Sequence, residues 1–282
     1  QVINSVLENS TGFRRFLIHG VTGSGKTLIY LKLIQHYIRE KKSVLFLIPE
    51  INLTPQLIDT FAEFLDCEIY AYHSELSDSE KFLMWKRAAE TGKPALFLGV
   101  RSSVFLPVKE LGLIIIDEEH DTSFKQEDRC PYNARDVASK KAQLLQVPIV
   151  MGSATPSVEN YAQFHKPENR KNLFELTNRA GNAFLPKIEL IDARSEKGDE
   201  SGEIWPLVPK AKEAIAASLA KGEQALVFVN RLGFANYLQC RSCGHQFHCP
   251  NCAITLRYYK KKGQLACHHC EYKIPMPEQC PH

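Results

Sequence analysis

A glycine-rich segment near the start of the chain has the pattern of a phosphate-binding loop. The segment reads Gly20-Val21-Thr22-Gly23-Ser24-Gly25-Lys26-Thr27. An apolar run that predicts a strand precedes it, and an amphipathic run that predicts a helix follows it. Glycines let backbone N–H groups turn towards phosphate oxygens, and the helix start adds positive potential. The pattern therefore predicts an ATP site in which Lys26 reaches the β- and γ-phosphates and Thr27 ligates Mg²⁺. A strand–helix turn without a ligand is the alternative, and it is disfavoured because eight positions and both flanks agree.

A second group of polar residues follows the apolar run Leu113–Ile116. This acidic box reads Asp117-Glu118-Glu119-His120. In a parallel sheet it would lie at the carboxyl edge, beside the phosphate-binding loop. Asp117 is suited to hold the Mg²⁺ shell, and Glu118 is suited to orient or deprotonate the attacking water. The alternative is an acidic strand end that caps the next helix, which the upstream loop disfavours.

Seven of the nine cysteines lie after residue 239. They are Cys240, Cys243, Cys249, Cys252, Cys267, Cys270 and Cys280. The first six form three Cys-x2-Cys pairs, and each pair fits a zinc knuckle in which two thiolates of one turn bind one ion. Two knuckles make a closed four-thiolate site. Chance clustering or a redox pair is the alternative, and three complete pairs in so short a stretch disfavour it.

The composition is that of an ordinary globular protein. The 282 residues are 44% apolar and 24% charged, which excludes a collagen-like, coiled-coil or wholly disordered chain. No apolar run approaches the ~20 residues of a membrane helix, and no secretory leader is evident. A cytoplasmic setting is therefore expected, in which paired cysteines bind metal more often than they form disulfides.

The net charge is small but unevenly distributed. It is +3 for the whole chain, whereas residues 240–282 hold six Lys or Arg against two acids and sum to +4. The first 239 residues therefore sum to −1. A mildly basic final segment indicates an anionic partner.

Short apolar runs alternate with amphipathic ones, which predicts a parallel sheet with helices on both faces. Strands are predicted at 16–19, 44–48, 69–71, 95–98, 113–116 and 149–150. Helices are predicted at 26–40, 55–65, 77–89 with a Ser77/Glu80 capping box, 134–145 and 158–164. A joint at 166–186, a strand at 188–191, a helix at 210–221 and a strand at 225–229 would follow.

Several of these motifs are similar to those of a known class. The phosphate-binding loop, the acidic box and Gly152-Ser153-Ala154-Thr155-Pro156 resemble superfamily 2 helicases of the DEAH/DEXH kind. Further segments, in chain order, closely resemble the primosomal protein N′ (PriA) family of bacterial replication-restart helicases. They are 49–56, 73–74, 99–105, 123–127, 132–136 and 230–235, together with the cysteine array. This similarity runs over nearly the whole chain.

The resemblance implies an α/β fold with three parts. Residues 1–180 would be a RecA-like, ATP-binding helicase lobe, residues 187–239 the start of a second lobe, and residues 240–282 a zinc module that is truncated at its end. The implied function is an ATP-dependent DNA helicase or translocase that restarts replication at stalled or collapsed forks. The implied partners are forked and single-stranded DNA, single-stranded DNA-binding protein and primosome proteins.

The resemblance also implies roles for single residues. Gln1 would read the adenine, and His120 with Ser153, Ala154 and Thr155 would couple the γ-phosphate to the DNA strand. Arg101 and the segment 49–56 would lie along single-stranded DNA. The loop 121–133, with Phe124 and Tyr132, would stack on bases and couple DNA binding to hydrolysis. A surface loop whose aromatic side chains pack on the core remains the alternative.

The resemblance pairs the cysteines into two interleaved zinc sites. Cys249, Cys252, Cys267 and Cys270 would hold one ion, and Cys240, Cys243 and Cys280 the other, with a fourth ligand missing. Two Zn²⁺ are thus expected in a full-length protein and one complete site here. The basic-aromatic stretch 257–262 would contact DNA or a partner protein, or form a solvated turn. We expect an excised central piece that is weak or inactive alone, because the chain begins with Gln1 and lacks the second-lobe arginine.

Two other functions remain open on the sequence. One is a zinc-stapled nucleic-acid or protein binding module whose phosphate-binding loop is regulatory. The other is a different superfamily 2 DNA translocase, such as a restriction-enzyme motor, against which the cysteine array argues. ATP turnover that rises with DNA would separate a helicase from a scaffold.

Overall fold

The computed structural model describes most of the chain, in two units. The described residues are 2–8, 12–49, 55–90, 92–127, 130–179, 187–191, 207–228, 238, 240, 242–270 and 272–281. Unit 1 comprises Gln1–Pro186 and unit 2 comprises Lys187–His282. Within the described ranges, the structure has no helix with the length and apolar character that crossing a membrane requires.

The centre of unit 1 is a parallel sheet. Among the described residues, seven strands form it in the order β3-β4-β2-β5-β8-β1-β9. Their bounds are β1 Arg15–Gly20, β2 Ser43–Leu47, β3 Glu68–Tyr72, β4 Ala95–Gly99, β5 Leu111–Ile116, β8 Ile149–Ser153 and β9 Leu173–Leu176. Every pairing between neighbours is parallel. The six strands predicted from apolar runs are confirmed. Five of them are central strands, as runs buried on both faces usually are, and β3 is a half-buried edge strand.

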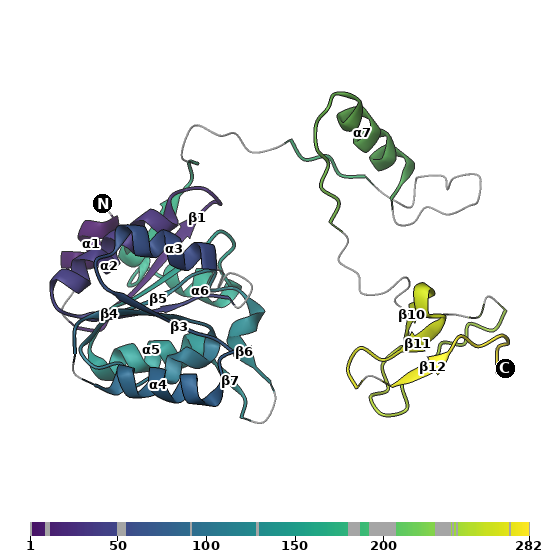
Figure 1. The fold of residues 1–282 in the computed structure, drawn as a ribbon. Helices are drawn as coiled ribbons and strands as arrows, with labels where there is room; N and C mark the ends of the chain where they lie inside the picture. Colours follow the sequence, from purple (N-terminus) through teal and green to yellow (C-terminus); the bar gives the residue numbers. More distant parts are fainter. Residues whose placement is uncertain are drawn as a thin grey trace. The chain divides into compact units, whose positions relative to one another are not determined.

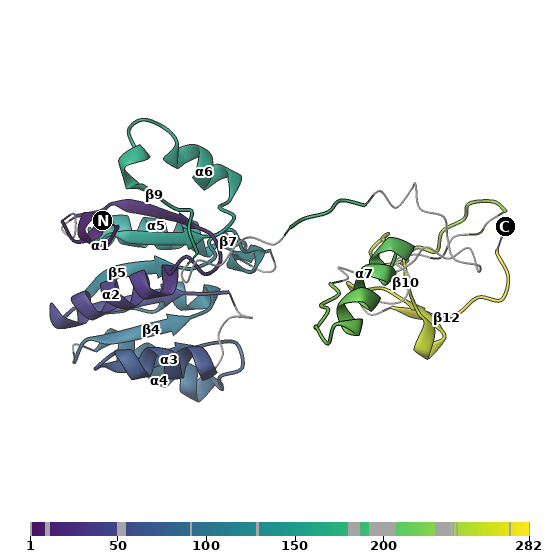
Figure 2. The same ribbon diagram turned by 90° about the horizontal axis from the view of Figure 1, so that it is seen from above.

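Helices cover both faces of this sheet (Figures 1 and 2). Their bounds are α1 Val2–Glu8, α2 Lys26–Arg39, α3 Pro55–Phe64, α4 Asp78–Ala89, α5 Ala134–Leu145 and α6 Val158–Phe164. α1, α2 and α3 share one apolar cluster with the sheet, and α4, α5 and α6 share the other. The predicted capping box is present, since Ser77 accepts from the Glu80 backbone and Glu80 accepts from that of Ser77. The predicted α/β fold with two covered faces is therefore confirmed.

The strand order brings the polar motifs to one edge. β8 lies between β5 and β1, so the residues that follow these three strands are neighbours. The phosphate-binding loop follows β1, the acidic box follows β5, and Ser153 ends β8. Because parallel strands end at the same edge, segments more than a hundred residues apart meet there.

Strand β9 was not predicted, since residues 166–186 read as a joint. Its residues Leu173–Leu176 pair in parallel with β1, and Leu176 O accepts from Val21 N at 3.2 Å. β9 is a short edge strand that is only half buried, so it lacks the fully apolar run that marks a central strand. It supports the start of the phosphate-binding loop.

Unit 2 contains the predicted helix but not the predicted strands around it. Helix α7, Pro209–Ala220, begins with Pro209 at its first position. The predictions of strands at 188–191 and 225–229 are wrong for the described residues 188–191 and 225–228, which form no strand. Leu190 and Leu226 are 93% and 98% exposed. An apolar run forms a strand only where a neighbour pairs with it, and the described part of unit 2 offers these runs none.

The end of unit 2 contains a small antiparallel sheet, whose strands were not predicted from the sequence. Its strands are β10 Arg257–Tyr259, β11 Gln264–Ala266 and β12 Lys273–Pro275, in that order. A 3₁₀ turn, Lys260–Lys262, joins the first two. The buried residues of this part are Cys249, Leu256, Leu265, Ala266 and Cys267. Two of the predicted metal ligands thus belong to its apolar core.

Candidate nucleotide site and zinc centre

The phosphate-binding loop has the conformation that its glycines predict. Gly23 and Gly25 have φ angles of 79° and 90°, and a Cβ on either would meet no atom within 4 Å. Helix α2 starts directly after Gly25, and no side chain caps its first N–H groups. The buried Ser24 hydroxyl has no hydrogen-bond partner among the residues described here. Open glycine backbone, an uncapped helix start and an unpaired hydroxyl together fit a bound phosphate group.

Lys26 lies inside this loop and is only 9% exposed. Its ammonium group donates to Gly20 O at 2.8 Å and lies 3.9 Å from Glu118 Oε1. An ammonium group has three donors, so the contact with Gly20 leaves capacity for phosphate oxygens. Thr27, the next residue, is exposed at the helix start. The structure therefore brings the lysine of the loop and the glutamate of the acidic box together.

Asp117 follows β5 and is tied to helix α2. Tyr30 donates its hydroxyl hydrogen to Asp117 Oδ1 at 3.0 Å, and Tyr30 is fully buried. Burial raises the pKa of Asp117, and neighbouring Glu118 raises it further, while the Tyr30 hydrogen bond and Lys26 oppose these effects. A buried carboxylate that depends on nearby donors and cations suits a Mg²⁺ ligand. Tyr30 carried no signal in the sequence, because its apolar spacing fits a core position.

Glu118 and His120 connect the acidic box to the end of β8. Glu118 has a φ of 45°, a left-handed conformation that is uncommon outside glycine. Its Oε2 lies 3.6 Å from His120 Nδ1. The same His120 nitrogen lies 2.7 Å from Ser153 Oγ, and Thr155 N donates to Ser153 Oγ at 3.0 Å. The predicted coupling residues His120, Ser153 and Thr155 are thus in direct contact.

Glu119 was not among the predicted site residues, yet it makes the most contacts in the box. It is fully buried, with 0% exposure. Its carboxylate accepts from Ser157 N at 2.6 Å, Ser157 Oγ at 3.0 Å and Asn160 Nδ2 at 2.6 Å. Arg135 Nη1 donates to it at 2.9 Å. The sequence signal for Glu119 is an acidic residue that follows an apolar run, with an arginine further along the chain. This combination is too common to identify a buried ion pair.

Arg101 holds the following loop. It begins a 3₁₀ helix, Arg101–Phe105, and donates to Ser123 O at 3.3 Å and Lys125 O at 3.0 Å. It also lines a cavity of about 120 Å³ beside Ser123, Gln126 and Tyr132. The loop folds back as a short hairpin of β6, Lys125–Gln126, and β7, Tyr132–Asn133.

The prediction that Phe124 stacks on bases disagrees with its position. Phe124 is 1% exposed and belongs to the core of unit 1, so its ring faces cannot reach a base in this conformation. The alternative of an aromatic side chain that packs on the core is therefore the correct one for Phe124. Tyr132 is half buried, and its ring lies 5.0 Å from that of Phe105 in an edge arrangement. Gln1 and residues 50–54 lie outside the described residues.

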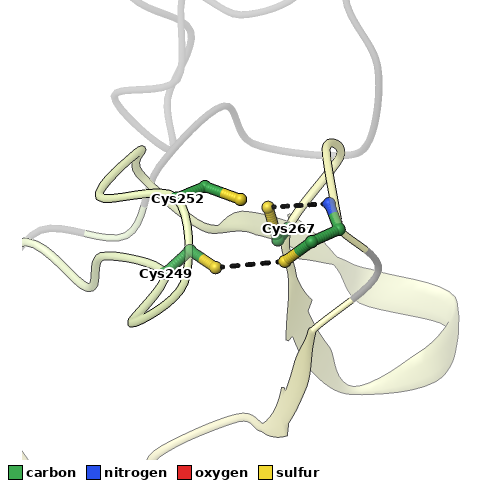
Figure 3. Close-up of side chains that lie close together, drawn as sticks. Cys249, Cys252 and Cys267 are labelled. Atoms are coloured by element: carbon green, nitrogen blue, oxygen red, sulfur yellow. Dashed lines mark hydrogen bonds between the residues drawn. The ribbon is translucent and has the colours of Figure 1, made fainter. Parts of the chain in front are cut away.

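The cysteines of unit 2 gather in two clusters. The four-thiolate cluster consists of Cys249, Cys252, Cys267 and Cys270, whose sulfur atoms all lie within 4.8 Å of one another. Figure 3 shows the labelled sulfur atoms of Cys249, Cys252 and Cys267 pointing towards one another. The three-thiolate cluster consists of Cys240, Cys243 and Cys280. These are the groupings that the family resemblance implied.

The spacing and surroundings of the thiols fit zinc. A tetrahedron with Zn–S bonds of ~2.3 Å places its sulfur atoms about 3.8 Å apart. Cys249 Sγ and Cys270 Sγ are 3.4 Å apart. Cys267 Sγ accepts from the backbone N–H groups of His269 at 3.3 Å and Cys270 at 3.5 Å. The backbone N–H of Tyr272, with the side chains of Cys249 and Asn251, lowers the pKa of Cys270 to about 6, which favours the thiolate form that binds metal. Without an ion, the neighbouring thiol of Cys270 and burial raise the pKa of Cys252 to about 12.

Two family models match this chain. The family model described as type III restriction enzyme, res subunit, matches residues 1–158. The chain belongs to this family. The model described as the PriA DNA helicase Cys-rich region domain matches residues 249–275, which include the whole four-thiolate cluster.

Relatives of similar sequence extend along nearly the whole chain. The replication restart protein PriA of Synechocystis sp. is 40% identical over 96% of this chain and 33% of its own length. That of Bacillus subtilis is 40% identical over 94% of this chain and 32% of its own length. The resemblance to the PriA family is thereby confirmed, and the chain spans about a third of the curated relatives that it matches. Among solved structures, RecG bound to a three-way DNA junction is 18% identical over 74% of this chain and 25% of that chain, with a TM-score of 0.43.

We predict that Glu119→Ala lowers the free energy of unfolding of unit 1 by about 3–5 kcal/mol. Removing one partner of a buried ion pair leaves the other charge without compensation, and Arg135 and Asn160 would both lose their acceptor. Chemical denaturation of the chain measures the loss.

The matched control is Glu127→Ala, since Glu127 also pairs with a cation, Lys125, at 2.7 Å, but both partners are exposed. This control should cost less than about 1 kcal/mol. Equal and small losses in the two variants would contradict the buried-pair account.

We predict that the two cysteine clusters differ in their hold on zinc. Four thiolates close a tetrahedral site, whereas the described residues of the other cluster supply three. The purified chain should keep about one zinc after treatment with a weak chelator. Cys267→Ser should lose that zinc, Cys243→Ser should keep it, and Cys67→Ser in unit 1 is the control.

Elemental analysis gives the zinc content, and circular dichroism reports whether the β10–β12 sheet persists. Two tightly held ions in the unaltered chain, or zinc retained by Cys267→Ser, would contradict this assignment.

Proposed function

We propose that the chain is the ATP-binding lobe, the start of a second lobe and the zinc module of an ATP-dependent DNA helicase that restarts replication. The observation that supports this most directly is the approach of Lys26 to Glu118, across 3.9 Å, beside the partly buried Asp117. A lysine in a glycine-rich loop and two carboxylates that follow a strand of the same parallel sheet are the parts that phosphoryl transfer needs. In this proposal residues 1–180, 187–239 and 240–282 are the three parts.

The loop binds the phosphates. The first N–H groups of α2 and the Ser24 hydroxyl donate to phosphate oxygens, and Lys26 neutralises the β- and γ-phosphates. Gly23 and Gly25 have no side chain that would separate the backbone from the nucleotide. Residues 20–27 form this part of the site, and Gln1 would contact the adenine.

The acidic box acts on the metal and the water. Thr27 and Asp117 would hold Mg²⁺, which when bound neutralises the charge that develops on the transferred phosphoryl group. Glu118 accepts a proton from the attacking water. Its carboxylate lies between Lys26 and His120, which hold its orientation.

The contact of His120 with Ser153 would couple the nucleotide site to bound nucleic acid. A change in the charge near Glu118 would alter the His120–Ser153 contact and shift the segment 153–155. Arg101 and Tyr132 lie on the cavity beside the loop 121–133 and would follow a single strand there. Phe124 would anchor this loop in the core and would not stack on bases.

The zinc clusters and the relatives suggest the wider context. We infer two zinc ions in a full-length protein, one in each cluster. The relatives from Synechocystis sp. and Bacillus subtilis are named replication restart protein PriA, which supports a role in DNA replication. Forked and single-stranded DNA are the proposed substrates, in a bacterial cytoplasm. Single-stranded DNA-binding protein and primosome proteins are the proposed partners.

The nucleotide site is tested by Lys26→Ala. The variant loses a charge-assisted contact of roughly 1.5–3 kcal/mol, so affinity for an ATP analogue should fall about tenfold or more. Lys32→Ala, an exposed lysine on the same helix, is the control and should bind like the unaltered chain. Calorimetry measures the affinity, and equal binding by both variants would mean that the loop is not the site.

The helicase proposal is tested by hydrolysis. A hybrid in which this chain replaces the matching third of the Bacillus subtilis relative tests the proposal in a full-length protein. Its ATP turnover should rise with single-stranded DNA, and Glu118→Gln should lower that rate by about 10²–10⁴-fold while ATP binding persists. The control is Glu127→Gln. Turnover that DNA does not stimulate would instead favour a binding module with a regulatory phosphate loop.

A further inference from the structure

The hydroxyl of Tyr30, on helix α2, lies beside the ends of strands β5 and β8 at the carboxyl edge of the sheet. Tyr30 is on helix α2, one turn after the phosphate-binding loop, and is fully buried. Its hydroxyl donates to Asp117 Oδ1 at 3.0 Å, after β5. Its ring also contacts Phe46 of β2 in an edge arrangement, with centroids 5.4 Å apart. The ring is thus held by packing, and the hydroxyl is directed to one carboxylate oxygen.

Gly152 of β8 leaves the space that this hydroxyl occupies. A Cβ on Gly152 would lie 1.6 Å from Tyr30 Oη and 2.9 Å from Tyr30 Cζ. The glycine is therefore required here by the close approach of the tyrosine. Gly152 directly precedes Ser153, so the hydroxyl lies where the strand ends of β5 and β8 meet.

A second buried tyrosine on the same helix shows that this arrangement is not a general property of α2. Tyr37 is 4% exposed, and its hydroxyl has no hydrogen-bond partner within the described part of the chain. Tyr37 therefore contributes apolar packing. Tyr30 differs in that its polar atom meets a carboxylate of the candidate metal site.

We propose that Tyr30 is a positioning residue for the metal: its hydroxyl holds Asp117 in the orientation that binds Mg²⁺, and Gly152 makes room for it. This inference rests on the proposed function, because the binding of Mg²⁺ by Asp117 is itself part of that proposal. The Tyr30 hydrogen bond engages Oδ1, and the same carboxylate also accepts a hydrogen bond from the Glu118 backbone, so two donors orient it. Hydrogen-bonded neighbours that orient metal ligands typically change metal affinity about 10–100-fold when removed.

The test is Mg²⁺-dependent binding of a non-hydrolysable ATP analogue, adenosine 5′-(β,γ-imido)triphosphate, to the 282-residue chain. Tyr30→Phe keeps the ring and removes the hydroxyl. The Mg²⁺ concentration for half-maximal binding should rise about tenfold or more. Affinity for the analogue in excess EDTA should change by less than about twofold, because the phosphate-binding loop is unaltered. Tyr37→Phe is the matched control and should behave as the unaltered chain in both conditions.

The outcomes separate this inference from the proposed function. If the unaltered chain binds the analogue more tightly with Mg²⁺, and the Tyr30→Phe variant has the same Mg²⁺ dependence, the inference alone is overturned. An equal loss with and without Mg²⁺ also overturns it, because Tyr30 would then act on the loop as a whole. No binding by the unaltered chain overturns the proposed function and this inference with it.

The contact with Gly152 has a readout that does not use nucleotide. Gly152→Ala should lower the unfolding midpoint in denaturant, because its Cβ would collide with the Tyr30 hydroxyl. The same substitution should cost clearly less in the Tyr30→Phe background, where that oxygen is gone. An equal cost in both backgrounds would show that the hydroxyl does not occupy the space beside Gly152, and would contradict the geometry on which the inference depends.

Discussion

A carboxylate with no exposed surface is stable in a protein only if hydrogen-bond donors surround it. Glu119 is such a carboxylate, so the segments around the acidic box must supply its donors. Its donors come from Arg135 on α5, Ser157 in the turn after β8 and Asn160 on α6. These segments must therefore approach the acidic box closely. A residue that takes no part in the proposed chemistry thereby sets the distance between the acidic box and the segment 152–157.

The residues on either side of Glu119 depend on this anchor. Glu119 N donates to Gly152 O, and Asp121 N donates to Glu118 O, so the backbone is tied before and after the turn. Glu118 keeps its left-handed conformation between these ties, a strain of order 1–3 kcal/mol that the surrounding structure must offset. With the turn held, Glu118 faces Lys26 and His120 faces Ser153. The same backbone hydrogen bonds keep Asp117 in contact with Tyr30. Asp117, Glu118 and His120 therefore each contact a different partner.

The zinc module depends on a different source of stability. Its buried apolar residues are few, with Leu256 and Leu265 at the centre beside Cys249 and Cys267. A unit of this size cannot bury enough apolar surface to offset the entropy of its chain, so a metal ion must supply folding free energy. Unit 1 needs no such addition, because two apolar clusters cover both faces of its sheet. The module is therefore the part whose structure should depend on its metal.

Local patterns in the sequence determined most of the elements and the chemistry of both sites. Apolar runs marked the five central strands and the edge strand β3, amphipathic spacing marked the helices, and fixed spacings marked the phosphate-binding loop and the cysteine pairs, because each of these signals arises from a few consecutive residues. Only the tertiary structure decided which separate segments meet. It placed Tyr30 on Asp117, buried Glu119 against Arg135, turned Phe124 into the core and added β9 to the sheet edge. It also left the runs 188–191 and 225–228 without strand partners. Those outcomes depend on neighbours distant in the chain, and a pattern within one segment holds no information about which neighbour will cover it.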